Sequence, residues 1–317
     1  MIVTILLLIA GLLLLIKGAD WMVQGASSLA RKYRISELII GLTIVAFGTS
    51  APELVVNVIA AFENHPDIVF GNIVGSNIVN LFLILGISGI ITPLVVQRST
   101  VWKEIPFSLF AALILFFLVN DVMFFKSKIN MMGRIDGFIL LVFFILFLVY
   151  IFRQMKKDKD LPQPETQIKN NFKIWLFILI GLASLVVGGK LIVNSAIQIA
   201  NSLGVSEKVI SLTIVAIGTS LPELATSVVA AIKKNKDLAV GNIIGSNIFN
   251  IFLILSISSL VRPISFDTIF NTDIFILVGG TIFLFTAMFT GEKKKLDRWE
   301  AIVLLIIYIG YTIYLIK

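Results

Sequence analysis

Two stretches of this chain are nearly identical and lie 170 residues apart. Residues 41–54 read GLTIVAFGTSAPEL and residues 211–224 read SLTIVAIGTSLPEL, while residues 71–80 read GNIVGSNIVN and residues 241–250 read GNIIGSNIFN. Each copy places one carboxylate, Glu53 or Glu223, inside a long apolar segment. Hydrocarbon tolerates such a charge only where it faces a cavity, a partner or an ion. The chain must therefore fold so that two equivalent acidic positions are shielded from lipid.

The apolar residues occur in runs of membrane-spanning length, which is about 20 residues. Of the 317 residues, 58% are hydrophobic and 14% are charged, and the mean hydropathy is +1.00. A soluble domain carries about 25% charged residues, so a large soluble α-helical protein is excluded. The pattern predicts an all-α polytopic protein of the cell membrane, with the lipid bilayer as its surroundings. Ten transmembrane helices are expected near residues 2–29, 37–62, 68–91, 105–125, 135–152, 173–200, 207–232, 238–260, 273–290 and 299–316.

These spans form two halves of five, at residues 1–152 (motif 41–80) and 173–317 (motif 211–250). Residues 153–172 are rich in charge, Pro and Gln and are expected to be a cytoplasmic linker. An odd number of spans makes the second half enter the membrane from the opposite side, which predicts two inverted repeats. Most of the 26 Lys and Arg residues then lie in loops on one side. The positive-inside rule assigns that side to the cytoplasm and both termini to the outside.

The net charge of +7 is explained by these loops, so no nucleic-acid partner is expected, and no obligate protein partner is evident. The chain has no cysteine and one histidine, His65, which excludes cysteine- or histidine-rich metal sites. Lys17 and Lys190 each lie within an apolar segment and are interpreted as structural, and the Lys17 side chain is expected to pair with Asp20 or to reach the interface.

Each half also has a proline, Pro52 or Pro222, directly before its glutamate. Proline removes a helical hydrogen bond and crowds the carbonyl four residues earlier, which frees the carbonyl of Gly48 or Gly218. Irregular backbone in a membrane survives where it lines a cavity or packs in protein. Helical spacing is expected to put most of Ala46, Thr49, Ser50 and Asn57 on one face with Glu53, and most of Ala216, Thr219, Ser220 and Ser227 on one face with Glu223. In the partner helices, Ser76 shares a face with Asn80 and Ser246 shares one with Asn250, and the polar groups of all these residues can offer oxygen ligands. Four further asparagines, Asn72, Asn77, Asn242 and Asn247, are expected to cap helices or brace the site.

Oxygen ligands favour hard cations such as Na⁺ and Ca²⁺ over copper, zinc or iron. Two neighbouring carboxylates repel each other strongly unless a cation or a proton neutralises them. One Ca²⁺ or two Na⁺ neutralise the pair, and proton binding is a third state. Mg²⁺ fits less well because it demands a small octahedral cage.

The paired motifs GTSAPE with GNIVGSN, and GTSLPE with GNIIGSN, resemble the two α-repeats of the cation/Ca²⁺ exchanger superfamily. Within it, the chain is similar to the prokaryotic Na⁺/Ca²⁺ exchangers over nearly its whole length. The resemblance implies that Ca²⁺ binds between Glu53 and Glu223, together with the carbonyls of Thr49 and Thr219. It implies Na⁺ sites built from oxygens of Ala46, Ser50, Ser76, Ala216, Ser220 and Ser246, with Asn80 and Asn250 in the middle of the cluster.

Family members typically exchange three Na⁺ for one Ca²⁺, so the resemblance implies an electrogenic secondary antiporter that works by alternating access. It also implies that the first and sixth helices slide across a rigid core. Asparagine at Asn250, where K⁺-dependent relatives carry aspartate, argues against K⁺ co-transport. The protein is expected to be no enzyme and to need no cofactor, with Na⁺ and Ca²⁺ as its transported ions.

Three alternatives compete with Na⁺/Ca²⁺ exchange. A Ca²⁺/H⁺ antiporter would use the same glutamate pair as proton carriers. A cation channel would also place acidic residues in the membrane, although inverted halves with a site at the midplane favour alternating access. An intramembrane hydrolase is disfavoured because the apolar segments lack a paired-aspartate or Ser/His arrangement.

Overall fold

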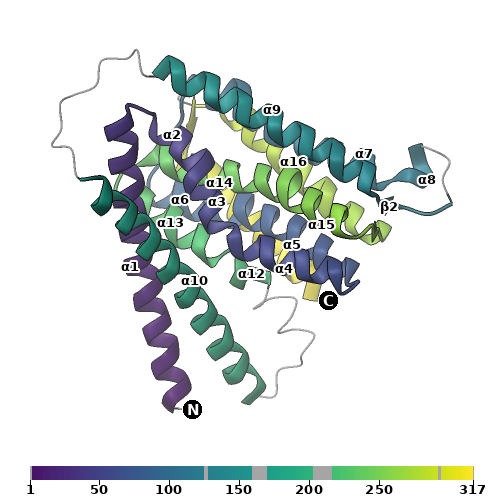
Figure 1. Cartoon of the computed structure of the whole chain (residues 1–317), viewed down its shortest axis with the longest axis horizontal. Helices are drawn as coiled ribbons and strands as arrows, with labels where there is room; N and C mark the ends of the chain where they lie inside the picture. Colours follow the sequence, from purple (N-terminus) through teal and green to yellow (C-terminus); the bar gives the residue numbers. More distant parts are fainter. Residues whose placement is uncertain (1, 125–127, 159–169, 203–215, 292–293, 317) are drawn as a thin grey trace.

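The computed structural model describes residues 2–124, 128–158, 170–202, 216–291 and 294–316. Almost all of these residues are helical (Figure 1), which confirms the predicted class of helical membrane protein. Eight helices of the described part are long and apolar enough to cross a membrane. The segments Glu37–Thr49 and Ala51–Phe62, bent by 48° relative to each other, make a ninth span if they are counted as one.

The membrane-spanning segments are built from the following elements: α1 (Ile2–Tyr33), α2 (Glu37–Ile40) leading into α3 (Ala46–Thr49) and α4 (Ala51–Phe62), α5 (Pro66–Ile78) continuing into α6 (Leu85–Ile91), α7 (Ile105–Val119), α9 (Arg134–Asp158), α10 (Asn171–Ser202), α14 (Lys236–Phe249) continuing into α15 (Ser256–Val261), α16 (Asn271–Ala287) and α17 (Arg298–Ile316). The expected span at 207–232 begins outside the described residues, and its described part is α12 (Ala216–Thr219) and α13 (Leu221–Ile232). The count of ten spans therefore stays a prediction.

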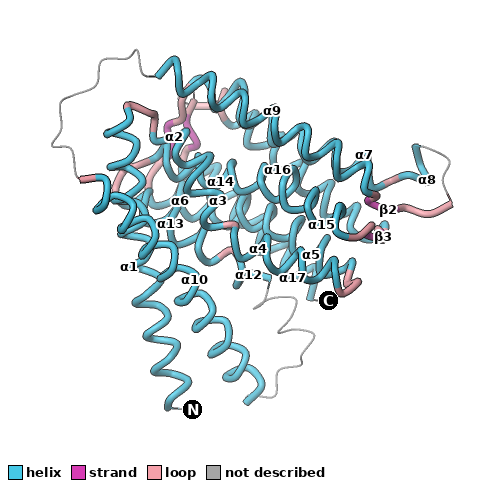
Figure 2. The backbone as a smooth tube through the Cα atoms, viewed as in Figure 1, coloured by secondary structure: helices cyan, strands magenta, loops and turns pink. Residues whose placement is uncertain are grey.

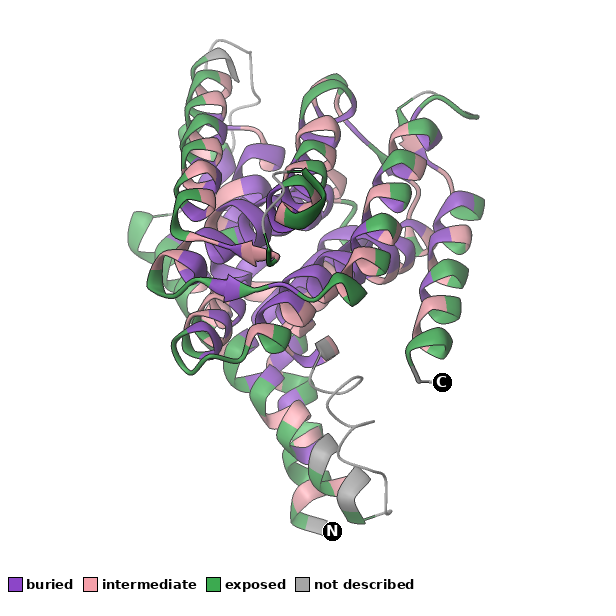
Figure 3. Ribbon diagram, turned by 90° about the vertical axis from the view of Figure 1, so that its right-hand side faces the viewer, coloured by how far each residue is buried: buried purple, intermediate pink, exposed green. Residues whose placement is uncertain are grey.

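Two central helices, α5 continuing into α6 and α14 continuing into α15, run through the middle of the molecule. They carry the second motif of each half. Every residue of α14 from Leu238 to Phe249 is buried. Large apolar side chains of the outer helices, such as Leu6, Phe138 and Leu179, are instead exposed. Figure 3 shows the same division, with buried residues inside and exposed residues on the outward helix faces. An apolar exterior around a partly polar interior is the distribution expected of a protein surrounded by lipid.

Two short antiparallel strand pairs join the halves at opposite ends of the molecule (Figure 2). Strand β1 (Leu94–Val95) pairs with β4 (Lys295–Leu296), and β2 (Met131–Met132) pairs with β3 (Ile264–Ser265). Flanking backbone bonds repeat the arrangement, since the Val96 amide donates to the Lys294 carbonyl and the Phe266 amide to the Asn130 carbonyl. In each pair, a strand that follows the central helix of one half meets a strand that precedes the last helix of the other half.

Helices α1 and α10 lie side by side and antiparallel, and they extend beyond the rest of the bundle (Figure 1). Glycines let their backbones meet. A Cβ atom at Gly11 would lie 2.9 Å from the carbonyl oxygen of Gly188, and one at Gly18 would lie 2.9 Å from that of Gly181. Such small residues permit close helix approach within a membrane. The two helices therefore form a tightly packed pair at the edge of the core.

Candidate ion-binding site

The first motif of each half forms a helix that breaks at a serine. Ser50 separates α3 from α4 with φ −84° and ψ 6°, and Ser220 separates α12 from α13 with nearly the same angles, −86° and 5°. Pro52 and Pro222 are the second residues of the helices that follow. Proline is tolerated there because the first amides of a helix have no intrahelical acceptor. The sequence predicted a disrupted turn between Gly48 or Gly218 and the following proline, and the structure puts the breaks within that turn, at the serines.

The breaks put Glu53 and Glu223 in the first turns of α4 and α13. Each helix start carries a partial positive charge that favours a carboxylate. Both side chains are buried, with exposed fractions of 2% and 1%. The two carboxylates are close enough to repel each other, and each has one buried oxygen, Oε2, without a hydrogen-bond donor among the described residues. Two buried carboxylates with unsatisfied oxygens lack the positive partner that buried charges require.

Ser50 crosses between the halves to reach the glutamate of the other repeat. Its Oγ donates to Glu223 Oε1 at 2.8 Å and lies 3.0 Å from Ser246 Oγ. The hydroxyls of Thr219 and Ser220 lie beside the Glu53 carboxylate in turn. Hydroxyls of the opposite half thus lie beside each glutamate. This follows from the position of the two broken helices next to each other.

Asn72 and Asn242 tie the two broken helices together. Asn72 Nδ2 donates to Thr219 Oγ1 at 3.3 Å, and Thr49 Oγ1 donates to Asn242 Oδ1 at 3.2 Å. Within its own half, Asn242 Nδ2 donates to Ser227 Oγ at 2.9 Å. These asparagines therefore hold the two threonines in place from the opposite half.

A second group of asparagines lies between the two central helices. Asn80 Nδ2 donates to Asn247 Oδ1 at 3.0 Å, and Asn250 Nδ2 donates to Asn77 Oδ1 at 3.0 Å. The Oδ1 atoms of Asn80 and Asn250 are buried without a donor in the described part of the chain. Both residues lie in π-helical segments, Val79–Ile84 and Asn250–Leu255, and such segments are frequent at functional sites. The amide groups are thus fixed by their nitrogens, which leaves both oxygens available.

The remaining predicted ligands lie in the same buried region. Ser76 is 1% exposed, and its Oγ has no hydrogen-bond partner among the residues that the structure describes, while Ser246 is completely buried beside Glu223. Ala46 is buried, and its carbonyl accepts the Ser50 amide at 2.9 Å. Ala216 begins α12, but its side chain lies outside the described residues.

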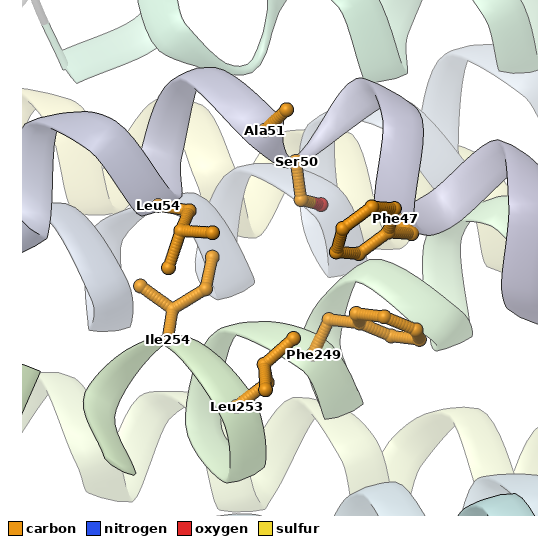
Figure 4. A pocket seen from close by; sticks show the side chains of 7 residues that line it. All are labelled: Phe47, Ser50, Ala51, Leu54, Phe249, Leu253 and Ile254. Atoms are coloured by element: carbon orange, nitrogen blue, oxygen red, sulfur yellow. The ribbon is translucent and has the colours of Figure 1, made fainter. Parts of the chain in front are cut away.

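A small pocket opens beside Ser50 (Figure 4). Ser50 is the only one of its lining residues with a side-chain oxygen, and the others are Phe47, Ala51, Leu54, Phe249, Leu253 and Ile254. The charged and amide side chains of the cluster are buried. Glu53, Glu223, Asn80 and Asn250 are each at most 2% exposed. The oxygen cluster is therefore sealed from bulk solvent in this conformation.

The sequence analysis expected Asn72, Asn77, Asn242 and Asn247 to cap helices or brace the site and placed them below Asn80 and Asn250, and all four make side-chain contacts between the halves. Their presence in both GN-x-x-GSN motifs was the available signal. The described residues contain no cluster of three or more His, Cys, Asp or Glu side chains that could hold a metal ion. The candidate site therefore combines two carboxylates with hydroxyl and amide oxygens.

Comparison with known proteins identifies the group to which this architecture belongs. Residues 3–153 and 173–317 match the family described as sodium/calcium exchanger protein. The chain is 34% identical to the sodium/calcium exchanger MaX1 of Methanosarcina acetivorans over 99% of its own length and 98% of that protein. It is 36% identical to the inner membrane protein YrbG of Escherichia coli, over 82% and 81% of the two chains. A solved structure of the sodium-calcium exchanger NCX_Mj superimposes with a TM-score of 0.80 at 34% identity, covering 98% of this chain and 97% of that one. This chain is therefore a member of the sodium/calcium exchanger family, a transporter of the cation/Ca²⁺ antiporter type.

Proposed function

We propose that this protein exchanges Na⁺ for Ca²⁺ across the cell membrane through the buried oxygen cluster. The observation that carries the proposal is the pair Glu53 and Glu223, buried together with an unsatisfied oxygen on each. Buried carboxylates without a cationic side chain are stable when a bound cation neutralises them. The relatives named sodium/calcium exchangers support the choice of ions.

In this proposal, Ca²⁺ binds between the carboxylates of Glu53 and Glu223, with the carbonyls of Thr49 and Thr219 completing its shell. The threonine hydroxyls are held by Asn242 and Asn72, which restricts the backbone that carries those carbonyls. Na⁺ binds around this position to oxygens of Ala46, Ser50, Ser76, Ala216, Ser220 and Ser246. Asn80 and Asn250 line the middle, which their amide oxygens support, since these are buried without a donor among the described residues.

Neutralisation of the two glutamates explains how Na⁺ transport is coupled to Ca²⁺ transport. Two ionised glutamates contribute two negative charges, which one Ca²⁺ or two Na⁺ neutralise. Since both loads use the same oxygens, they compete, and binding one releases the other. Neutralisation of the glutamates accounts for two Na⁺, and the third comes from the resemblance to cation/Ca²⁺ exchangers, whose members typically exchange three Na⁺ for one Ca²⁺. On that basis we propose a 3 Na⁺: 1 Ca²⁺ stoichiometry, in which one charge moves across the membrane in each cycle.

We further propose ten spans in two inverted five-helix repeats, with the linker at 153–172 in the cytoplasm and both termini outside. The strand pairs β1–β4 and β2–β3 support this topology, because equivalent segments of the halves lie at opposite ends of the molecule. Inverted repeats with a site between broken helices are typical of secondary transporters. Transport is driven by the ion gradient, without enzymatic chemistry or a cofactor.

The decisive experiment is uptake of radioactive Ca²⁺ into Na⁺-loaded proteoliposomes, with Na⁺ removed outside and equal pH on both sides. Uptake should collapse when choline replaces internal Na⁺, and it should be absent in Glu53→Gln and Glu223→Gln. Asp67→Asn is the matched control, because Asp67 is an exposed carboxylate in the first turn of α5. Uptake that ignores Na⁺ but follows an imposed pH gradient would assign the protein to Ca²⁺/H⁺ exchange instead.

A further inference from the structure

An ion pair at the edge of the core ties α1 to the turn between α13 and α14. The Lys233 ammonium contacts the Asp20 carboxylate and also approaches the Asp20 carbonyl oxygen at 3.4 Å. A second contact reinforces it, since Asn235 Nδ2 donates to Ser27 Oγ at 2.6 Å. Both contacts join the α1–α10 pair to the core of the protein on the same side.

The internal repeat places an equivalent ion pair in the other half, with both charges reversed. The motifs align with an offset of 170 residues, and α1 and α10 follow the same offset, because Gly11 and Gly18 correspond to Gly181 and Gly188. The partner of Asp20 in the repeat is then Lys190, and the partner of Lys233 is Glu63. Reversal of only one charge would have produced a repulsive pair, whereas Lys190 and Glu63 attract each other.

This second pair is not formed in the structure. The Glu63 carboxylate is 59% exposed and lies 3.9 Å from His65, and Lys190 is exposed on α10 without an acidic partner among the described residues. The Asp20 and Lys233 side chains are, by contrast, each 32% exposed. The two pairs therefore occupy equivalent positions of the repeat, but only the Asp20–Lys233 pair is in contact.

The geometry of α1 and α10 explains how one pair can exclude the other. Asp20 follows Gly18 by two residues and Lys190 follows Gly188 by two residues. Since Gly18 packs on Gly181 and Gly188 packs on Gly11, the antiparallel helices carry the two charged residues toward opposite ends of their crossing. A shift of the helix pair toward one end of the core thus brings one charge to its partner and moves the other charge away.

We propose that Asp20–Lys233 and Lys190–Glu63 are alternate latches, of which one closes in each of the two transport states. This inference rests on the proposed alternating access. In an inverted repeat, exchanging the contacts of the two halves converts a conformation open to one side into a conformation open to the other. The present structure has the Asp20–Lys233 latch closed. Lys190, which has no acidic partner among the described residues in this conformation, forms its contact in the other one.

Partly exposed ion pairs suit this task because they are weak. A latch must hold one state long enough to be populated, yet it must open in every transport cycle. Two latches of similar strength shift the equilibrium little overall, since each state gains one pair and loses the other. Removal of one latch should therefore favour the opposite state by roughly two- to fivefold, the equivalent of an exposed ion pair.

The chain contains no cysteine, so introduced cysteine pairs report the two contacts directly. One variant carries Asp20→Cys with Lys233→Cys, and a second carries Glu63→Cys with Lys190→Cys. Each is treated with a short bifunctional thiol reagent in vesicles, in Na⁺, in Ca²⁺ and in chelator. The matched control combines Glu63→Cys with Val187→Cys, which is exposed one turn earlier on α10.

We expect both pairs to cross-link, with yields that change in opposite directions between the ionic conditions. In a variant with all four cysteines, a single molecule should carry one cross-link and not both. Adding Lys233→Gln to the Glu63/Lys190 cysteine variant should raise its cross-linking rate roughly two- to fivefold. The combined exchange Asp20→Lys with Lys233→Asp, made in the same cysteine variant, should return the rate to its original value.

Two results would overturn the latches: a Glu63/Lys190 yield no higher than the Val187 control in every condition, or both cross-links in the same molecule. The cross-linking assay requires folded protein but no particular transported ion. It therefore separates failure of the latches from failure of the proposed function, which is read from Na⁺-dependent Ca²⁺ uptake by the unmodified chain.

Discussion

The Ser50 hydroxyl donates a 2.8 Å hydrogen bond to the Glu223 carboxylate, which belongs to the other half of the chain. Ser220, which occupies the same position in the second half, has a buried Oγ without a hydrogen-bond partner in the described residues. The site is thus asymmetric in its hydrogen bonds although it is symmetric in its residues. Ser50 stabilises the site in its present state, whereas the Ser220 oxygen is available to a bound ion.

This asymmetry predicts different effects of two equivalent substitutions. Ser50→Ala removes the donor of a buried carboxylate and should destabilise the ion-free protein by about 1–3 kcal/mol. Ser220→Ala removes a hydroxyl that has no hydrogen-bond partner in the described part of the chain and should leave the stability of the ion-free protein nearly unchanged. Thermal unfolding in chelator and choline measures both effects. Equal losses of stability in the two variants would contradict the asymmetry.

Much of this architecture could be predicted from the sequence, because membrane helices and a duplicated motif leave strong local patterns. Glu53, Glu223 and the hydroxyls around them were found from their spacing on one helix and its repeat. The contacts between the asparagines could not be found in this way. Asn80 and Asn247 are 167 residues apart, and helical periodicity carries no information on which residue of a distant helix lies opposite.

The prolines located the helix breaks to within one turn, because each frees the carbonyl four residues earlier. The exact break residue could not be predicted, since a proline at the second helical position marks a new helix start only when the chain before it is seen to end a helix. The strand pairs escaped prediction because each strand has only two residues, too few to show an alternating pattern. The π-helical turns at Asn80 and Asn250 likewise leave no periodicity of their own.

Asn250→Asp should make transport depend on pH. The new carboxylate adds a third buried negative charge to the proposed site, so it binds either a cation or a proton. As the pH falls, the aspartate takes up a proton, becomes neutral and resembles the original asparagine. Ca²⁺ affinity should therefore differ from that of the unmodified chain at high pH and approach it at low pH. Asn80→Asp is the equivalent change in the first half, and Ca²⁺ uptake measured from acid to alkaline pH compares the three proteins. Identical pH profiles would show that neither amide borders the bound ions.

Gly181→Ala should impair the contact between α1 and α10. An added Cβ would lie 2.7 Å from the Met22 amide nitrogen and 2.8 Å from the Gly18 carbonyl oxygen, both of which are backbone atoms. The helices must separate to accommodate it, and overpacking of this kind costs about 1–3 kcal/mol. We expect slower Ca²⁺ uptake and a lower unfolding temperature. Gly279→Ala in α16 is the control, because no atom lies within 4 Å of its added Cβ, and the substitution should preserve transport. Unchanged transport and stability in Gly181→Ala would exclude the tight glycine contact.

Voltage distinguishes the proposed 3:1 exchange from an electroneutral 2:1 exchange. When Ca²⁺ enters Na⁺-loaded vesicles and three Na⁺ leave, one positive charge leaves in each cycle. A potential that is positive inside should accelerate uptake, and one that is negative inside should slow it. One elementary charge moved through 100 mV corresponds to about 2.3 kcal/mol, so the Ca²⁺ accumulation at equilibrium should change by roughly 50-fold. Potassium gradients with valinomycin set the potential in both directions, and vesicles with equal potassium on both sides serve as the zero-voltage control. Uptake and accumulation that do not respond to the potential would refute the third Na⁺, while leaving Glu53 and Glu223 as a pair that two Na⁺ neutralise.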